Sequence, residues 1–326
     1  MKKIIAIGNA IVDVVCKVDE EFLAQNFLTK GSMSLIDETM AQTLSQLPSE
    51  KITSGGSAAN TIAAVAQLGG SCSFVGKVAL DDFGKKFISE IKKIGVDFVS
   101  TGYASDATAK SFILVTPDAQ RTMCTFLGCA SQIGEDDIDE EAFEGASMLY
   151  LEGYLWDQPT TIAALKKAIS IAKKRGIKIA FTLSDLFCVA RHKADFIDLV
   201  TNDLDILFAN ESEIKELVGI ENIEENNFQK LTDFFAKNKK LLAAVTRSEK
   251  GCMIFSAQKH LPFAAHKIAQ LVDTTGAGDC FAAGFLFGAN NNFAIEKSSD
   301  LANLLASRII QKFGARFDET EIKDVV

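Results

Sequence analysis

The sequence has little proline and no compositionally biased tract. Only 4 of its 326 residues are proline, which argues against a disordered tail or a long linker. No segment approaches the ~20 apolar residues that a membrane span needs. The opening run MKKIIAIGNAIVDVV resembles a signal peptide, but Asn9 and Asp13 interrupt it and no small-residue cleavage site follows. We therefore interpret the start of the chain as a first buried strand.

Basic residues are also in short supply. The chain has 34 Lys and Arg against 43 Asp and Glu, a net charge of −9, and no basic cluster, so we expect no nucleic-acid and no membrane partner. The seven cysteines are scattered without a C-x-x-C pair, which indicates reduced, mostly buried thiols in a cytoplasmic protein. The three histidines show no metal-binding spacing.

The motifs of two nucleotide-binding classes are absent. No G-x-x-x-x-G-K-[ST] occurs, and no G-x-G-x-x-G follows the first strand, so a P-loop kinase and the usual dinucleotide-binding fold are unsupported. What the sequence does have is 48% hydrophobic residues. That is enough to build the core of one large α/β domain, which we expect to span residues 1–326.

Short apolar, β-rich runs alternate with helical patterns in the second half of the chain. The sequence predicts strands and helices over these ranges: strands at 148–153, 177–183, 205–210 and 241–246, helices near 159–175 and 226–238. This alternation predicts an α/β fold with a central, mostly parallel sheet flanked by helices.

Two stretches, about 11–37 and 96–127, break this rhythm. Their strand-like runs follow one another without intervening helices, at 11–18, 31–37, 96–103, 109–116 and 121–127. We expect them to form a small, partly exposed β-sheet that acts as a lid over a ligand cleft. An edge extension of the main sheet is the alternative.

A glycine-rich turn precedes a long apolar helix pattern at DTTGAGDCF, residues 273–281. Gly276 and Gly278 permit a tight turn whose backbone N–H groups can approach an anion, and the helix dipole adds positive potential there. Asp279 then has two interpretations. It satisfies the helix N-terminus, or it takes a proton from an attacking hydroxyl while the amides hold a transferring phosphoryl group.

Three further patterns each leave two interpretations open. Gly55 and Gly56 lead into a helix with Asn60 one turn in, which suits a polyhydroxyl ligand or simply a tightly packed helix. Asn210 and Glu213 end a strand and begin a helix, where they could hold Mg²⁺ through its waters or form a capping box.

The last of these patterns is VTRSEKGCMIF at 245–255. Thr246 at the end of a strand could touch a nucleotide phosphate, and Gly251 lies in the turn that follows. A plain hairpin is the alternative.

GGSAAN at 55–60, NESE at 210–213 and DTTGAGDCF at 273–281 occur in an order that resembles the PfkB/ribokinase superfamily of sugar and nucleoside kinases. The resemblance spans nearly the whole chain. It implies a ribokinase-like fold and an ATP-dependent enzyme that phosphorylates a primary hydroxyl. GNAIVDV at 8–14 and RTMCTFLGCA at 121–130 are similar to the nucleoside branch, the adenosine kinases, so that adenosine is the expected acceptor and AMP the product.

The resemblance also implies roles for individual residues. Asp279 would be the catalytic base, with the amides of Gly276, Ala277 and Gly278 as anion hole. The remaining implied contacts are grouped by ligand: Asn9, Asp13, Gly55, Gly56 and Asn60 for the sugar hydroxyls; Arg121 for the phosphates, from the lid; Asn210 and Glu213 for Mg²⁺; Thr246, Gly251 and Asn303, with Asn210, for ATP; and the backbone carbonyls of Asp273 and Thr275 for a K⁺ ion.

Aromatic residues suggest how a base could bind. Tyr154 and Trp156 in EGYLWD could stack on it or pack in the core, and Ile11 could line the base pocket. The alternatives for the whole protein are another sugar kinase of the superfamily, for ribose or fructose, and a catalytically silent nucleotide-binding protein. A dinucleotide oxidoreductase is a further, less supported one. Monomer and homodimer both remain open.

Overall fold

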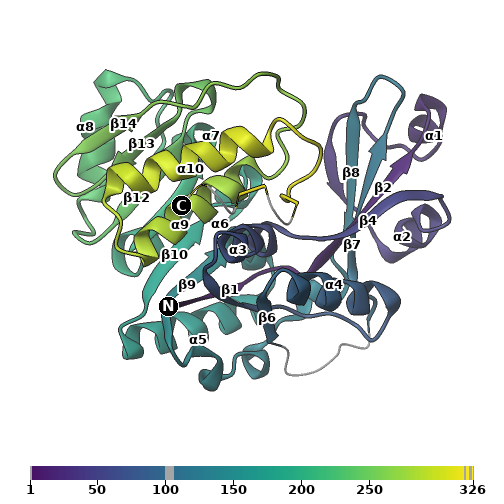
Figure 1. The fold of residues 1–326 in the computed structure, drawn as a ribbon, viewed down its shortest axis with the longest axis horizontal. Helices are drawn as coiled ribbons and strands as arrows, with labels where there is room; N and C mark the ends of the chain where they lie inside the picture. The colour runs from purple at the N-terminus through teal and green to yellow at the C-terminus, as the bar shows by residue number, and fades with distance from the viewer. Residues whose placement is uncertain (1, 100–105, 319–320, 323–324, 326) are drawn as a thin grey trace.

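The computed structural model describes residues 2–99, 106–318, 321–322 and 325 (Figure 1). Within them, nine strands form a larger sheet in the order β14-β13-β12-β11-β10-β9-β1-β5-β6. The strands from β12 to β6 pair in parallel, and β13 and β14 are antiparallel. Their bounds are β1 Lys3–Ile7, β5 Ser71–Val75, β6 Val96–Val99, β9 Ala146–Glu152, β10 Lys178–Thr182, β11 Ile206–Asn210, β12 Leu242–Thr246, β13 Cys252–Phe255 and β14 His260–Phe263.

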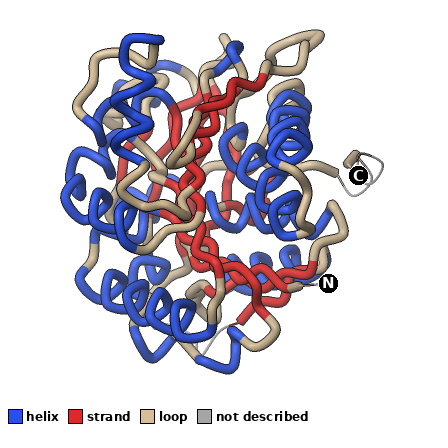
Figure 2. Tube along the Cα trace, turned by 90° about the vertical axis from the view of Figure 1, so that its left-hand side faces the viewer, coloured by secondary structure: helices blue, strands red, loops and turns tan. Residues whose placement is uncertain are grey.

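Helices cover both faces of the larger sheet (Figure 2). Side chains of β1 alternate between the two hydrophobic cores of the protein. Ile4 and Ala6 belong to the core that includes α3, α9 and α10, whereas Ile5 and Ile7 belong to the core that includes α5 to α8. Because both faces are buried, the inner parallel strands are mostly apolar. The helix bounds are α3 Ser57–Gln67, α4 Asp82–Lys93, α5 Pro159–Arg175, α6 Leu186–Asn202, α7 Glu211–Val218, α8 Glu225–Phe235, α9 Ala277–Asn290 and α10 Ile295–Ile309.

The predicted α/β architecture is confirmed by this mostly parallel sheet flanked by helices. Helix α5 has the predicted bounds because its end signals are strong: proline stands in its first turn, and Gly176 closes it in the left-handed conformation at φ 67°. Helix α8 ends at Phe235, three residues before the predicted end at 238.

A smaller five-stranded sheet lies to one side of the body, at the right of Figure 1. Its order is β3-β8-β7-β2-β4, with helices α1 and α2 beside it. The bounds are β2 Ile11–Lys17, α1 Glu20–Gln25, β3 Met33–Leu35, α2 Glu38–Leu44, β4 Ser49–Gly55, β7 Ala109–Val115 and β8 Arg121–Phe126. Strand β2 follows β1 after three residues, so residues 8–10 cross directly from the larger sheet to the smaller one.

One expectation for the smaller sheet needs correction, and one of its strands was not predicted. Residues 96–99 were predicted to belong to it, but β6 pairs in parallel with β5 at the edge of the larger sheet, and residues 100–103 lie outside the described part. A strand that follows a crossover helix such as α4 returns to its parallel neighbour. Strand β4, which pairs with β2, was not predicted because SEKITSG is polar and largely exposed.

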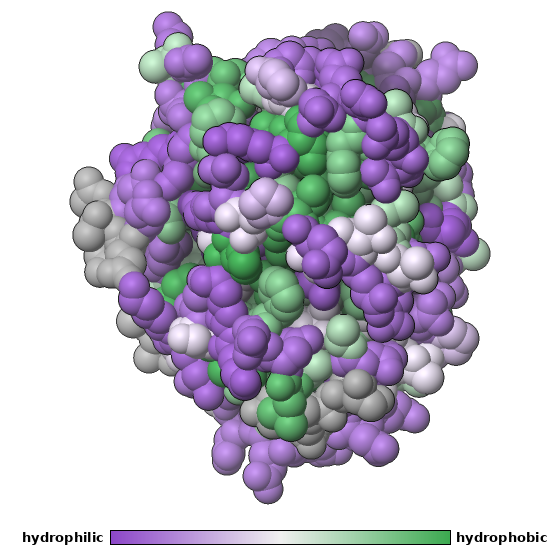
Figure 3. Space-filling model, turned by 90° about the vertical axis from the view of Figure 1, so that its right-hand side faces the viewer, coloured by the Kyte–Doolittle hydropathy of each residue, from purple (hydrophilic) through white to green (hydrophobic). Residues whose placement is uncertain are grey.

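The side of the molecule that carries the smaller sheet has apolar surface among polar side chains (Figure 3). Phe27, Met33 and Leu35 in this part of the chain are exposed. All seven cysteines are buried and unpaired by disulfides, as their spacing predicts. No helix within the described residues is both long and apolar enough to cross a bilayer. A cytoplasmic location and the oligomeric state stay predictions.

Candidate active site

A cavity of about 570 Å³ lies where the carboxyl ends of the parallel strands meet the smaller sheet. Open α/β sheets place ligand sites at this edge, because polar side chains that follow buried strands converge there. Residues at or just after the ends of five strands line it: Asn9, Glu152, Thr182, Asn210 and Thr246. The other lining residues include the start of α9, the smaller sheet and the start of α6.

The glycine-rich turn before α9 brings Asp279 to this cavity. Gly276 adopts φ 78°, and a Cβ there would lie 2.7 Å from Cα of Ala315, so only glycine fits the turn. No side chain caps α9, and the Asp279 carboxylate instead accepts hydrogen bonds from Ser57 Oγ at 2.7 Å and Asn60 Nδ2 at 3.2 Å. The capping interpretation of Asp279 therefore does not describe its contacts.

Burial raises the pKa of Asp279 to about 6, although hydrogen bonds from Ser57 and Asn60 and the charge of Arg316 oppose the shift. Asp13 on β2 behaves alike: burial raises its pKa to about 6, Arg316 opposes the shift and the negative charge of Asp279 adds to it. Two carboxyls thus share one electrostatic environment at the cavity. Each gains or loses its proton within about one unit of neutral pH.

The second glycine pair allows β4 and α3 to approach strands β1 and β2 closely. A Cβ on Gly55 would lie 2.4 Å from Oδ2 of Asp13. Gly56 has φ 94°, and a Cβ there would lie 2.2 Å from the carbonyl oxygen of Asn9. Gly55 and Gly56 are therefore glycines for reasons of space, and the structure brings Asn9, Asp13 and Asn60 together as predicted.

Glu152 belongs to the same site, and sequence reasoning missed it. Its Oε1 accepts hydrogen bonds from Asn9 N at 2.8 Å and Asn9 Nδ2 at 2.9 Å, and its Oε2 accepts one from Ala58 N at 2.8 Å. The side chain is fully buried, which raises its pKa to about 7 against these hydrogen bonds. Glu152 ties β9, the residues after β1 and the first turn of α3 into one unit. A carboxylate at a strand end was its only signal.

Arg121 and Asp273 join the smaller sheet to the glycine-rich loop. Arg121 on β8 donates from Nη1 to Asp273 Oδ2, which also accepts from Gly314 N at 2.8 Å. Thr275 donates to the other carboxylate oxygen, from Oγ1 at 2.7 Å and from N at 3.1 Å. In this structure Arg121 is therefore engaged by Asp273 and is not part of the cavity lining.

Asn210 and Glu213 form the capping box that was one of their two interpretations. Glu213 N donates to Asn210 Oδ1 at 2.9 Å, while Asn210 N and Nδ2 donate to the Glu213 carboxylate at 2.9 and 2.6 Å. Both residues also line the cavity. Burial raises the pKa of Glu213 to about 7.

Asn210 and Glu213 are suited to bind a metal ion through its water ligands and not directly. Both Glu213 oxygens already accept hydrogen bonds, and no group of three His, Cys, Asp or Glu in the described ranges could hold an ion directly. Mg²⁺ retains several waters when bound to proteins. Asn210 and Glu213 are thus suited to hydrogen-bond those waters.

Of the residues expected to border ATP, some line the cavity and others do not. Thr246 lines the cavity, at the end of β12 where a hairpin leads into β13. Gly251 and Asn303 do not line it: a Cβ on Gly251 would meet the carbonyl oxygen of Phe263 at 2.0 Å, and Asn303 Nδ2 donates to the carbonyl of Ala264 at 3.1 Å. These two lie together near the end of β14.

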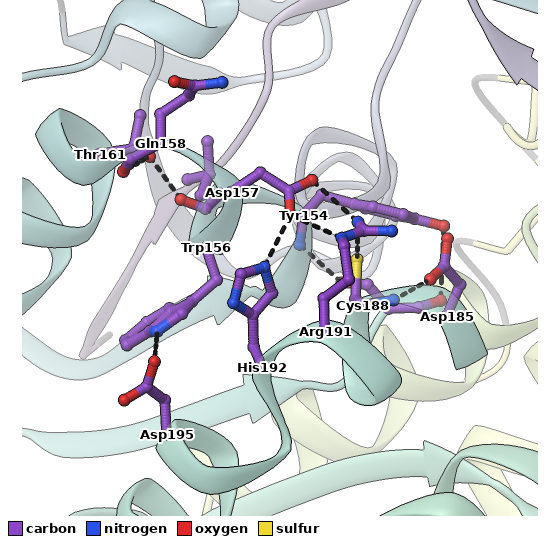
Figure 4. A network of polar contacts seen from close by, with 12 residues as sticks. Tyr154, Trp156, Asp157, Gln158, Thr161, Asp185, Cys188, Arg191, His192 and Asp195 are labelled. Atoms are coloured by element: carbon purple, nitrogen blue, oxygen red, sulfur yellow. Dashed lines mark hydrogen bonds and ion pairs between the residues drawn. The ribbon is translucent and has the colours of Figure 1, made fainter.

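The two aromatics of EGYLWD point in different directions (Figure 4). Trp156 is buried, donates from Nε1 to Asp195 at 3.3 Å and packs edge-on against Phe181 and Phe196. Trp156 is therefore a core residue and cannot stack on a ligand. Tyr154 does line the cavity.

Arg191 and Asp157 also line the cavity and form a bidentate ion pair (Figure 4). Arg191 donates from Nε to Asp157 Oδ1 at 3.0 Å and from Nη2 to Asp157 Oδ2 at 2.9 Å. His192 Nε2 lies 2.6 Å from the same carboxylate. This network places a fixed positive charge at the cavity while Asp157 compensates it.

Known proteins are similar to this chain over nearly its whole length. A model of the pfkB family carbohydrate kinases matches residues 1–322. The chain belongs to this family. The adenosine kinase of Sinorhizobium meliloti is 40% identical, with a TM-score of 0.86 and coverage of 97% of this chain and 95% of that one. A probable sugar kinase from Rhizobium etli CFN 42 is 37% identical, with a TM-score of 0.87 and coverage of 98% and 97%.

A more distant relative in this family is a sugar kinase by name. Fructokinase-1 of Zea mays is 30% identical over 74% of this chain and 76% of its own. Membership in the pfkB family confirms the ribokinase-like fold and the predicted class, a phosphotransferase with an alcohol group as acceptor.

An apolar wall completes the cavity of this pfkB-family chain. Its side chains come mainly from the smaller sheet: Ile11, Met33, Leu35, Met123, Leu127 and, from α6, Phe187. Met33, Leu35 and Phe187 are 47, 58 and 68% exposed. Large apolar side chains are left open to solvent here, and such surface marks a binding site.

Proposed function

We propose that the protein transfers the γ-phosphoryl group of ATP to the 5′-hydroxyl of adenosine and so forms AMP. The observation that carries the proposal is the mixed lining of the cavity. Polar side chains, among them Asn9, Asp13 and Asn60, line it together with apolar ones, among them methionines, leucines and Phe187. A nucleoside has both kinds of surface, whereas a free sugar would leave the apolar wall exposed to water.

The polar residues of the cavity would supply the chemistry. Asp279 would accept the proton of the attacking hydroxyl, and a pKa of about 6 keeps it mostly ionised yet still a competent base near neutral pH. The amides of Gly276, Ala277 and Gly278, at the start of α9, would stabilise the charge on the transferring group. Asp13, Asn9 and Asn60 would orient the ribose, with Gly55 and Gly56 leaving room for Asp13 and for the backbone of Asn9.

Asn210 and Glu213 would hold Mg²⁺ through its waters, and Thr246 would contact the phosphates. The ion supplies charge neutralisation for the ATP phosphates. The smaller sheet would close as a lid and exclude water, which otherwise competes as acceptor. Arg121 would approach the phosphates on closure. Gly251 and Asn303 beside ATP, and a K⁺ ion at Asp273 and Thr275, stay predictions.

The relatives support adenosine and one rival, a sugar. The adenosine kinase of Sinorhizobium meliloti at 40% identity supports the proposal. The 30% identity to Zea mays fructokinase-1 supports a sugar kinase instead.

A coupled assay of ADP release decides between these substrates. Adenosine, guanosine, uridine, ribose and fructose are each offered with ATP and Mg²⁺, and the product is identified by mass. We expect turnover with adenosine and the formation of AMP, and none with Asp279→Asn. Turnover with ribose or fructose, and none with adenosine, would show that the protein is a sugar kinase. ATP binding without any phosphorylated product would indicate a silent nucleotide-binding protein.

A further inference from the structure

The chain segment after α10 packs against the glycine-rich loop. Gly314 N donates to Asp273 Oδ2 at 2.8 Å, and the carbonyl of Phe317 accepts from Gln67 Nε2 of α3 at 2.9 Å. Ala315 lies against Gly276, where no Cβ could fit. Residue 316 is therefore held between the loop that precedes Asp279 and the helix that carries Asn60. No motif in the sequence points to it.

The guanidinium of Arg316 contacts two elements of the site. Its Nε donates to Asn60 Oδ1 at 2.9 Å, and its Nη1 donates to Ser54 Oγ on β4. Arginine has donors only, so Asn60 must present its oxygen to Arg316. The Asn60 nitrogen then faces the other way, where it donates to Asp279 at 3.2 Å. One arginine thereby determines which end of the Asn60 amide meets Asp279.

Arg316 also places a fixed positive charge near several carboxylates. The charged and titratable groups around it and its neighbours come from five elements: Asp13 on β2, Glu90 on α4, Arg121 on β8, Glu152 on β9 and Asp279 on α9. The negative charge of Asp279 raises the pKa of Asp13. The positive charge of Arg316 lowers the pKa of both carboxyls against the effect of burial.

A purely structural role would not require this charge. Burial lowers the pKa of Arg316 to about 10 against the pull of Asp13, Glu90 and Asp279, which shows that the charged form is costly here. Its Nη2 is buried with no hydrogen-bond partner in the described part of the chain. A neutral side chain of similar size would fill the space without either cost.

We propose that Arg316 is a positioning residue for phosphoryl transfer, which orients the Asn60 amide toward Asp279 and keeps the Asp13–Asp279 pair ionised for proton abstraction. The inference rests on the function proposed above. Lysine could supply the charge but not the fixed geometry of Nε and Nη1, because its ammonium is a single point donor. The two parts of the role can therefore be separated by substitution.

The test compares Arg316→Gln and Arg316→Lys with the native protein, using adenosine and ATP over pH 5 to 9. Arg316→Gln should lower kcat roughly 10- to 100-fold, the scale of a small misplacement of catalytic groups, and should leave KM for ATP nearly unchanged. The acidic limb of its kcat–pH profile should move to higher pH. Arg316→Lys should have the acidic limb at the native pH but a kcat below the native value. Arg175→Gln, which removes an equal charge at the exposed end of α5, serves as control.

A second measurement does not depend on turnover. Carbon-detected NMR of aspartate carboxyls, with Asp279 assigned by Asp279→Asn, should show Asp279 titrating at higher pH in Arg316→Gln than in the native protein. Unchanged titration together with native kcat in a folded Arg316→Gln overturns the inference. If Arg316→Gln does not fold, Arg316→Lys decides: a native kcat overturns the inference, and a lowered kcat with an unmoved limb supports it. If the native protein phosphorylates no acceptor, the proposed function fails, and the NMR titration still tests Arg316.

Discussion

Asp279 and Asp13 approach the same end of the cavity from different layers of the molecule. Asp279 comes from the first turn of α9 and Asp13 from the strand that crosses into the smaller sheet. Burial raises the pKa of both to about 6. At the residue scale this is the central electrostatic fact about the site, because a carboxyl can act as a base only when it is ionised.

Replacing Asp279 by asparagine keeps the shape of the side chain but removes its basicity. We expect kcat to fall by about 10² or more, the scale of losing a general base, with ATP affinity retained. In the native protein kcat should fall as pH drops below about 6, because Asp279 becomes protonated there. Steady-state kinetics and an ATP-binding titration check both statements. Near-native turnover by Asp279→Asn would refute the assigned role.

Gly55 offers a test of the geometry around Asp13. In Gly55→Ala the new methyl would lie 2.4 Å from Oδ2 of Asp13, so the carboxylate must move. We expect KM for the phosphate acceptor to rise about tenfold or more, with KM for ATP little changed. Gly134→Ala is the matched control, since its Cβ would meet nothing closer than Asp137 Oδ2 at 3.9 Å. Equal rises in both KM values would contradict the placement of Asp13.

Single residues also mark the limit of sequence prediction. Asp279, Asn60 and Gly56 lie in short motifs, GGSAAN and DTTGAGDCF, that can be recognised from neighbouring residues alone. The structure brings these motifs together. Glu152 and Arg316 carry no such signal. Each reaches the site through the packing of distant segments, with Asn9 lying 143 positions from Glu152 and Asn60 lying 256 positions from Arg316.

At the scale of elements, periodicity identified strands better than it assigned them to sheets. The run VDFV alternates as any strand with one covered face would, and it does not say which neighbour it pairs with. The order of elements does: β6 follows helix α4, and such a crossover leads to a parallel partner. Strand β4 was missed for the opposite reason, since its polar sequence gives no apolar alternation to detect.

The contact between helices α9 and α10 depends on small residues. A Cβ on Gly284 would lie 2.7 Å from Cα and 2.8 Å from N of Ala302. Gly284→Ala gains about 1 kcal/mol of helix propensity, but the clash involves backbone, which cannot rotate away, and overpacking costs about 1–3 kcal/mol. We therefore expect a net loss of stability in urea unfolding.

Gly278→Ala is the control for that loss. It makes the same change in the same helix, with no atom within 4 Å of the new Cβ. Its free energy of unfolding should be unchanged or higher. A stability of Gly284→Ala equal to that of Gly278→Ala would show that the two helices separate without cost.

At the scale of the whole molecule, carboxyls with raised pKa values make stability depend on pH. Folding raises the pKa of Asp13 and Asp279 from 3.8 to about 6, and that of Glu152 and Glu213 from 4.5 to about 7. Between these limits the folded state holds protons that the unfolded state has released. Stability therefore falls as pH rises from about 4 to about 7. Carboxyls with lowered pKa values, such as Asp118 at about 2, have the opposite effect but act below pH 4.

Urea unfolding at pH 5 and pH 8 measures this dependence. We expect the larger free energy of unfolding at pH 5, and a smaller difference between the two in Asp279→Asn, which cannot ionise. Exposed Asp300→Asn is the control and should keep the native difference. Greater stability of the native protein at pH 8 would contradict the raised pKa values.

The burial of every native thiol has a practical consequence for following the smaller sheet in motion. Maleimide dyes react with accessible thiolates, and the seven cysteines are all inside the protein. Lys17 lies at the end of β2, and its side chain is 75% exposed. A single cysteine introduced in its place would therefore bind one fluorophore, and the native cysteines would not have to be replaced first. Its emission would report, in real time, how that sheet responds when each ligand is added.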